Sequence, residues 1–309
     1  MVHERTAHDV EVGARIDGAP WRLRVIEHRA GSGPATAVLG GMYGDKAMSC
    51  LALHELDRRL TETDLAGTVV LLPAVNLPGL DTATRVNRDH LALNRRFPGS
   101  ESGFLTDQFA HAIERIVLDA ADGVVDLHSG TPTMSLWYTY DYGDLELSAS
   151  FGLLPVATGF GHAGQLGTHA ASRGISLLLP EWGGGRLTDI GPGVEGTLNV
   201  LRYRGHVPGD LTGPATLPLI RERELMLASV PGVFESALGP DAVGQRVPSG
   251  TIGWMTDANT GRRIEEFRVE NDDAILMMAT AGPAVLGPGD FTFMVGRVAE
   301  QIPVPGGRR

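Results

Sequence analysis

Short apolar runs divide the first two thirds of the chain into segments with the spacing of alternating strands and helices. Alternation of apolar and polar residues predicts a strand at 21–28, and mainly apolar stretches predict strands at 35–39, 67–73, 123–130 and 175–185. Helices are predicted at 47–56, 105–118 and 194–203, and residues 75–80 are interpreted as a loop. A strand, a helix and a second strand at this spacing fit a right-handed crossover unit, so the pattern indicates an α/β sheet.

The pattern changes at about residue 221. From there, short β-like segments are separated by glycine and proline, at 225–229, 232–235, 250–255, 264–269, 274–278 and 291–295. Evenly spaced short strands are typical of a small barrel or sandwich. We therefore predict two domains, an α/β catalytic domain over residues 1–220 and a C-terminal β-barrel or sandwich over residues 221–309.

Composition narrows the classes of partner. The chain has 309 residues, enough for a sizeable core, and a formal net charge of -11. This charge argues against a nucleic-acid backbone or an anionic membrane as the main partner, but a local arginine cluster can still bind a small anion. Cys50 is the single cysteine, which rules out an internal disulfide. With no apolar signal-peptide core and no run of membrane-spanning length, we expect a cytoplasmic protein.

Four segments carry candidate chemistry. The strand at 35–39 breaks at Gly40 and Gly41 and restarts as a helix after Lys46, which puts this turn at the carboxyl edge of a sheet, where α/β enzymes place their active sites. Residues 84–99 are rich in arginine and asparagine, and guanidinium groups bind carboxylates in bidentate geometry. Two further strands end on His128 and Glu181. His162 and His169 show no ligand spacing and are interpreted as surface or loop residues.

These segments together resemble the succinylglutamate desuccinylase/aspartoacylase branch of the zinc carboxypeptidase superfamily. The turn resembles Gly-x-His-Gly-x-Glu, the arginine-rich segment resembles Asp-Leu-Asn-Arg-x-Phe-Pro-Gly with Ala92 in place of the aspartate, and the two strand ends resemble Asp-Leu-His-Ser and Glu-x-Gly-Gly. The resemblance implies a carboxypeptidase-like mixed sheet flanked by helices, followed by a small β-domain. It also implies an amide hydrolase, a deacylase acting on an N-acyl amino acid or a similar small carboxylate.

The resemblance assigns roles to individual residues. Arg85, Asn94 and Arg95 match the positions that bind the substrate carboxylate and polarise the scissile carbonyl. Glu181 matches the general base, and His128 matches the third zinc ligand. Because Ala92 replaces an aspartate of the motif, the contacts that hold the arginine-rich loop in place should differ from those in the family.

Two of the three zinc-ligand positions carry other residues. Tyr43 stands where the histidine belongs and could bind a metal only weakly, as phenolate; Lys46 stands where the glutamate belongs and, when protonated, has no acceptor. We therefore predict no metal and no cofactor, with zinc only if other ligands rescue the site. A protonated Lys46 would supply a similar net positive charge, so we expect its ammonium within hydrogen-bonding reach of Glu181 or His128.

Three functions stay open on this evidence. The first is hydrolysis or acyl transfer, with Glu181, Lys46, His128 and Tyr43 as catalytic groups and Arg85, Asn94 and Arg95 as the substrate site. The second is a metal-independent proton transfer, elimination or cyclisation that uses Glu181 and Lys46. The third is a non-catalytic binding protein. In each case the partner is a small carboxylate-bearing molecule, and formation of a homo-oligomer stays open.

Overall fold

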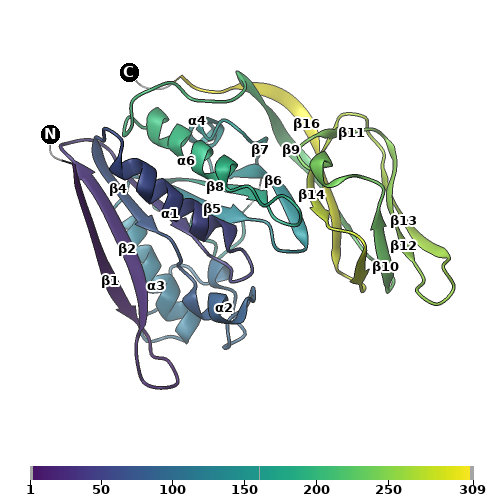
Figure 1. Cartoon of the computed structure of the whole chain (residues 1–309), viewed down its shortest axis with the longest axis horizontal. Helices are drawn as coiled ribbons and strands as arrows, with labels where there is room; N and C mark the ends of the chain where they lie inside the picture. Colours follow the sequence, from purple (N-terminus) through teal and green to yellow (C-terminus); the bar gives the residue numbers. More distant parts are fainter. Residues whose placement is uncertain (1–2, 160, 307–309) are drawn as a thin grey trace.

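The computed structural model of this chain describes residues 3–159 and 161–306. Its main feature is a twelve-stranded mixed sheet (Figure 1). The strands, in spatial order, are β1 (Glu4–Val12), β2 (Trp21–Ala30), β4 (Gly67–Leu72), β3 (Ala35–Gly40), β5 (Gly123–Ser129), β8 (Ser176–Gly183), β6 (Met134–Asp141), β7 (Val156–Ala157), β9 (Thr216–Leu227), β16 (Phe291–Pro303), β14 (Ala274–Thr280) and β11 (Arg246–Val247). Strands β4, β3, β5 and β8 run parallel, so their carboxyl ends meet at one edge.

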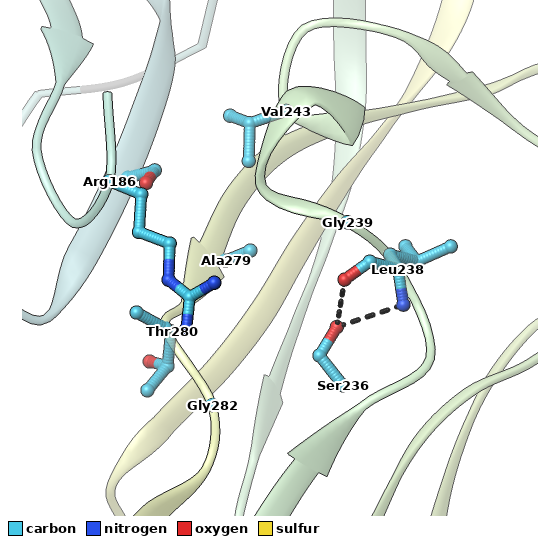
Figure 2. A pocket seen from close by; sticks show the side chains of 10 residues that line it. Arg186, Ser236, Leu238, Gly239, Val243, Ala279, Thr280 and Gly282 are labelled. Atoms are coloured by element: carbon cyan, nitrogen blue, oxygen red, sulfur yellow. Dashed lines mark hydrogen bonds between the residues drawn. The ribbon is translucent and has the colours of Figure 1, made fainter.

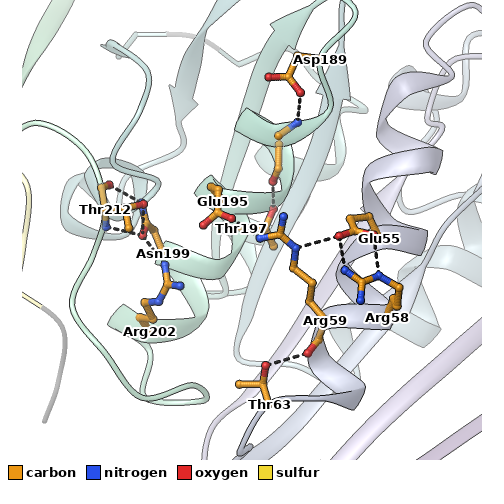
Figure 3. A network of polar contacts seen from close by, with 12 residues as sticks. Glu55, Arg58, Arg59, Thr63, Asp189, Glu195, Thr197, Asn199, Arg202 and Thr212 are labelled. Carbon is orange, nitrogen blue, oxygen red and sulfur yellow. Dashed lines mark hydrogen bonds and ion pairs between the residues drawn. The ribbon is translucent and has the colours of Figure 1, made fainter.

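Helices cover both faces of the parallel strands. One face packs against α1 (Met48–Thr61), α4 (Leu145–Ser150) and α6 (Gly191–Tyr203), and the other against α3 (Leu105–Leu118) and α5 (Leu166–Ser172). Each face has its own apolar cluster, because the buried strands carry apolar side chains on both sides. Figure 3 shows Arg59 of α1 between Glu55 of the same helix and Glu195 of α6, a polar contact that joins the two helices.

The C-terminal region adds a second, four-stranded sheet. Its order is β13 (Arg263–Val269), β12 (Gly250–Thr256), β10 (Gly232–Ser236) and β15 (Ala284–Leu286). Edge-to-face contacts among Phe234, Phe267 and Phe293 join this sheet to β16. The predicted fold class, a mixed α/β sheet with helices followed by a β region, is confirmed.

The main sheet runs into the C-terminal region. Strand β9 (Thr216–Leu227) pairs with β7 on one side and β16 on the other, so the predicted boundary between residues 220 and 221 falls inside a strand. The division of the chain into two domains at this point stays a prediction. None of the helices in the described part of the chain has the length and apolar character needed to span a membrane.

The interpretation of residues 75–80 as a loop is wrong. A short helix, α2 (Leu77–Thr82), forms there, and the side chain of Asn76 caps it by accepting a hydrogen bond from the backbone N–H of Gly79. An asparagine cap followed by proline in the first turn is a helix-start signal. Six residues are too few for an apolar period to be recognised, so the signal lay in the cap alone.

Candidate active site

The site forms where the carboxyl ends of three neighbouring strands meet. His128 of β5 lies opposite Glu181 of β8 in the parallel ladder, and Tyr138 of β6 lies opposite Glu181 on the other side. The turn after β3 brings Tyr43 and Lys46 to the same place. All four predicted catalytic side chains belong to buried residues: Tyr43, Lys46, His128 and Glu181 are 3%, 6%, 2% and 7% exposed.

Close backbone packing fixes this turn. The N–H of Gly44 donates to the carbonyl oxygen of Thr84 at 3.1 Å, and the N–H of Lys46 donates to the carbonyl oxygen of Tyr43 at 3.1 Å. A Cβ added at Gly44 would lie 1.9 Å from the carbonyl oxygen of Gly79, in α2. Only glycine fits there without displacement of its neighbours. The turn therefore packs directly against α2, the helix that was not predicted from the sequence.

Lys46 and Glu181 form a buried ion pair. The ammonium nitrogen Nζ of Lys46 lies 2.6 Å from Oε2 of Glu181, and the two side chains are 7% and 10% exposed. The sequence predicts a contact of this kind. Buried ionised groups are retained only when paired, so each side chain holds the other in place.

His128 belongs to a second polar pair, with Asp126 two residues earlier on the same face of β5. Nε2 of His128 lies 3.1 Å from Oδ1 of Asp126, and Asp126 is fully buried. The other ring nitrogen, Nδ1, lies 3.7 Å from Oε1 of Glu181 and has no hydrogen-bond partner among the described residues. Asp126 was not among the predicted site residues. Its position two residues before His128 in a strand places both side chains on the same face, and this spacing could have indicated the contact.

Tyr43 contacts both predicted carboxylate-binding arginines. Its hydroxyl oxygen is 3.4 Å from Nη2 of Arg85 and 3.5 Å from Nη1 of Arg95, and the Arg85 guanidinium lies 4.2 Å from the centre of its ring. Burial raises the pKa of the Tyr43 hydroxyl and outweighs the opposing effect of the two guanidinium groups. Tyr43 therefore stays a neutral phenol with a proton to donate.

The arginine-rich loop is anchored by Asn94. Its Oδ1 accepts a hydrogen bond from the N–H of Leu166 at 2.9 Å, and its backbone oxygen accepts one from Nη1 of Arg95 at 2.6 Å. These contacts join the loop to α5 and aim Arg95 at Tyr43. Asn94 thus both lines the site and holds it together.

A cavity of about 110 Å³ lies among these groups. Its lining includes six of the seven predicted site residues, namely Tyr43, Arg85, Asn94, Arg95, His128 and Glu181, while Lys46 lies behind Glu181. Tyr140, Tyr142, Gln165 and Arg223 also line it and were not predicted. Burial raises the pKa of Tyr140 to about 12, so this phenol is also a neutral donor.

The two histidines interpreted as surface or loop residues lie in different places. His162 is exposed in a loop, as predicted, yet it lines the cavity. His169 is half-buried in α5, where its Nε2 lies 3.2 Å from Oε1 of Glu114, so the loop interpretation is wrong for it. Helix α5 is too short for its period to be recognised.

A second cavity, of about 250 Å³, lies elsewhere, between the turn after β8 and loops of the C-terminal region (Figure 2). Arg186 is the one charged residue among those that line it, alongside Ser236 and Thr280. It shares no lining residue with the smaller cavity. Since a reaction needs several polar groups directed at one point, the smaller cavity is the candidate active site.

Comparison with known proteins shows what this chain is similar to. The model of the succinylglutamate desuccinylase/aspartoacylase catalytic domain matches residues 32–167, which include six of the predicted site residues. A succinylglutamate desuccinylase/aspartoacylase structure from Rhodobacter sphaeroides superposes with a TM-score of 0.81 at 26% identity, over 95% of this chain and 96% of that one. Residues 32–167 are thus similar to the catalytic domain of the succinylglutamate desuccinylase/aspartoacylase family, and nearly the whole chain shares the fold of a protein with that name.

Two other proteins that are similar to this chain carry more specific names. The N-alpha-acetyl-L-2,4-diaminobutyric acid deacetylase of Halomonas elongata is 35% identical over 109 residues, which are 35% of this chain and 32% of that protein. The match thus spans about a third of the curated relative. The product-bound ectoine utilization protein EutE from Ruegeria pomeroyi has a TM-score of 0.81 at 22% identity, over 95% of both chains, and shows the shared fold.

Zinc, which the family resemblance implies, does not fit the donors of this site. The three positions assigned to zinc ligands hold Tyr43, Lys46 and His128. Lys46 is an ammonium in an ion pair and Tyr43 is a neutral phenol, a weak metal ligand, which leaves Nδ1 of His128 as the single good zinc ligand among these three positions. Within residues 3–159 and 161–306, no group of three or more His, Cys, Asp or Glu side chains is arranged to hold a metal ion.

Proposed function

We propose that this chain is a metal-independent amide hydrolase that removes the acyl group from an N-acyl amino acid or a similar small carboxylate. The observation that carries the proposal is the buried Lys46–Glu181 ion pair beside a cavity that keeps Arg85, Asn94 and Arg95. The two arginines offer a binding surface for a carboxylate, and Lys46 offers a positive charge next to Glu181. Neither requires a metal.

Substrate binding rests on the two arginines. Arg85 and Arg95 approach the cavity from the same side as Tyr43 and point their guanidinium groups at its hydroxyl. Guanidinium groups bind carboxylates through charge-assisted, paired hydrogen bonds. A cavity of about 110 Å³ limits the ligand to a small molecule.

Stabilisation of the oxyanion falls to Tyr43 and its neighbours. A neutral phenol whose oxygen already faces two guanidinium groups has its proton free to donate to a carbonyl oxygen. One such donor contributes roughly 2.7–4 kcal/mol, whereas zinc activates water by on the order of 12 kcal/mol. We therefore expect slow turnover of unactivated amides and faster turnover of substrates with a good leaving group.

A second candidate function is a binding protein for small carboxylates. It is favoured by the contact between Lys46 and Glu181, because a carboxylate that neutralises a lysine is less available as a base. Such a protein would bind the same ligands and release them unchanged. Turnover therefore separates the two functions, while affinity does not.

The deciding experiment combines metal analysis with a substrate screen. Purified protein is assayed for bound metal and incubated with a panel of N-acyl amino acids, with and without a chelator. The proposal expects less than stoichiometric metal and chelator-resistant release of the free amine. Chelator-sensitive activity, or tight binding of the panel without turnover, contradicts it.

The anion site makes a separate prediction. Arg95→Ala should weaken binding of an N-acyl amino acid by about 2 kcal/mol or more, about 30-fold, because a charged partner is left unpaired. Calorimetric titration measures the affinity. Arg88→Ala is the matched control, since Arg88 lies exposed in the same loop and does not line the cavity. Equal affinities in the two variants would remove Arg95 from the site.

A further inference from the structure

We propose that His128, oriented by Asp126, is the base that activates water in this site, and that Glu181 is not. This inference rests on the proposed hydrolysis and names the group that takes the proton. Asp126 is a positioning residue, because it acts through the imidazole ring. The proposal stands on three observations: the Asp126–His128 contact, the unpartnered Nδ1, and the Lys46–Glu181 ion pair.

The contact with Asp126 fixes which ring nitrogen carries the proton. Nε2 of His128 lies 3.1 Å from Oδ1 of Asp126, in a fully buried position on the same strand face. A carboxylate accepts hydrogen bonds and has no proton to give, so Nε2 must be the donor. The neutral ring then has its lone pair on Nδ1. Edge-on packing of the Tyr43 and His128 rings, 5.5 Å between centres, restricts rotation of the imidazole.

Nδ1 belongs to a side chain that lines the cavity. The nitrogen is buried and has no hydrogen-bond partner among the described residues. Oε1 of Glu181 is 3.7 Å from Nδ1, beyond hydrogen-bonding distance. A buried acceptor without a partner is costly, and a water molecule or substrate hydroxyl in the cavity would supply the missing donor.

Charge decides between the two candidate bases. Protonation of Glu181 would leave the Lys46 ammonium, 2.6 Å away, without a counter-charge in a buried site. Protonation of His128 would instead place an imidazolium between two carboxylates, with Asp126 at 3.1 Å and Glu181 at 3.7 Å. Glu181 is thus engaged by Lys46, whereas Nδ1 of His128 has no hydrogen-bond partner among the described residues, so we assign the role of base to His128.

The step is balanced in atoms and electrons. Water loses a proton to Nδ1, its oxygen bonds to the acyl carbon, and the carbonyl electron pair moves to the oxygen that the Tyr43 hydroxyl faces. When the intermediate collapses, the carbon–nitrogen bond breaks and the imidazolium returns its proton to the leaving amine. The products are a carboxylic acid and an amine, the acid then gives its proton to the amine or to solvent, and no other reactant is required.

The tautomer of His128 tests the inference without any substrate. Long-range ¹⁵N–¹H correlation spectra of histidine-labelled, ligand-free protein distinguish a protonated ring nitrogen from a bare one. We expect a protonated Nε2 and a bare Nδ1 in the wild-type protein, and loss of this single tautomer in Asp126→Asn. A protonated Nδ1 in the neutral wild-type ring would overturn the proposal.

Activity gives the second readout. With an N-acyl amino acid that the wild-type protein turns over, Asp126→Asn should lower kcat by about 10³- to 10⁴-fold, with little change in KM, as in hydrolases whose histidine loses its orienting aspartate. Combining it with His128→Gln should lower kcat no further than His128→Gln alone, because the two residues act as a unit. A kcat within tenfold of wild type in folded Asp126→Asn would overturn the proposal.

The chain supplies a matched control. Asp57 contacts the buried His28 in the same way, 2.9 Å from Oδ1 to Nε2, and neither residue lines the cavity. Asp57→Asn should leave kcat unchanged, so an equal loss in both variants would mark a general effect of removing an Asp–His pair and overturn the assignment. Failure of the proposed function looks different: no N-acyl amino acid is turned over by the wild-type protein, whatever tautomer the spectra show.

Discussion

Two residues of one turn, Tyr43 and Lys46, stand where the family resemblance implies zinc ligands. A ligand set of histidine, glutamate and histidine offers lone pairs to a metal. Tyr43 and Lys46 offer protons instead, a neutral phenol and an ammonium. In the proposed metal-independent reaction, these donors surround Nδ1 of His128, and Lys46 supplies the positive charge that a metal would otherwise supply.

At this scale, the first prediction concerns the ion pair. Lys46→Met should lower the free energy of unfolding by about 3–5 kcal/mol, because Glu181 would be left as an unpaired buried charge. Replacing both partners, with Lys46→Met and Glu181→Leu, should recover much of this loss. Urea denaturation measures both. Arg58→Met is the control, because its ion pair with Glu55 lies exposed on α1 and its loss should change little.

A second prediction at the residue scale concerns zinc. Lys46→Glu alone should not bind zinc tightly, because Tyr43 is still a neutral phenol. Tyr43→His together with Lys46→Glu should bind it, since the pair restores two ligands beside His128. Zinc titration with a competing chelator measures the affinity. A folded double variant that binds no zinc, or a wild-type protein that holds one equivalent, would contradict the proposed metal-free site.

At the scale of elements, sequence and structure agree where a segment is long or carries a motif. The helix predicted at 105–118 is α3 with the same bounds, and the strands that end on His128 and Glu181 lie side by side. Contacts set by sheet register were not predictable. Tyr140 lies in β6, a strand for which no sequence signal was recognised. Arg223 lies in β9, which follows the strand of Glu181 well along the sequence. Nothing local in these segments indicates that they meet Glu181.

The turn and α2 make the element-scale prediction. Gly44→Ala should lower the free energy of unfolding by about 1–3 kcal/mol, because a methyl group would lie 1.9 Å from the carbonyl oxygen of Gly79 and push the turn off the helix. Substrate binding should weaken with it, since Tyr43 and Lys46 move with the turn. Gly239→Ala is the control: its φ is -70° and no heavy atom lies within 4 Å of the added methyl. Equal stability of the two variants, measured by thermal denaturation, would contradict the predicted packing.

On the scale of the whole molecule, distant segments are joined by buried polar residues as well as by apolar clusters. His206, which follows α6, accepts a hydrogen bond at Nε2 from the Thr36 hydroxyl of β3 at 2.7 Å. Its Nδ1 donates to the carbonyl oxygen of Ala66, just before β4, at 2.8 Å. One neutral imidazole thus connects the end of α6 to β3 and to the residue just before β4, and it can do so only while uncharged.

Stability should therefore depend on pH through His206. Burial lowers its pKa from 6.5 to about 4, so between these values the unfolded chain binds a proton that the folded protein excludes. The free energy of unfolding should be highest above pH 6.5 and should fall by about 3 kcal/mol as the pH drops toward 4. Burial also lowers the pKa of His28, which adds to the loss with the same sign. Urea denaturation from pH 4.5 to 7.5 should show a shallower slope for His206→Asn than for the wild-type protein. Identical slopes would mean that His206 is protonated in the folded state, which two hydrogen bonds to fixed partners and its burial argue against.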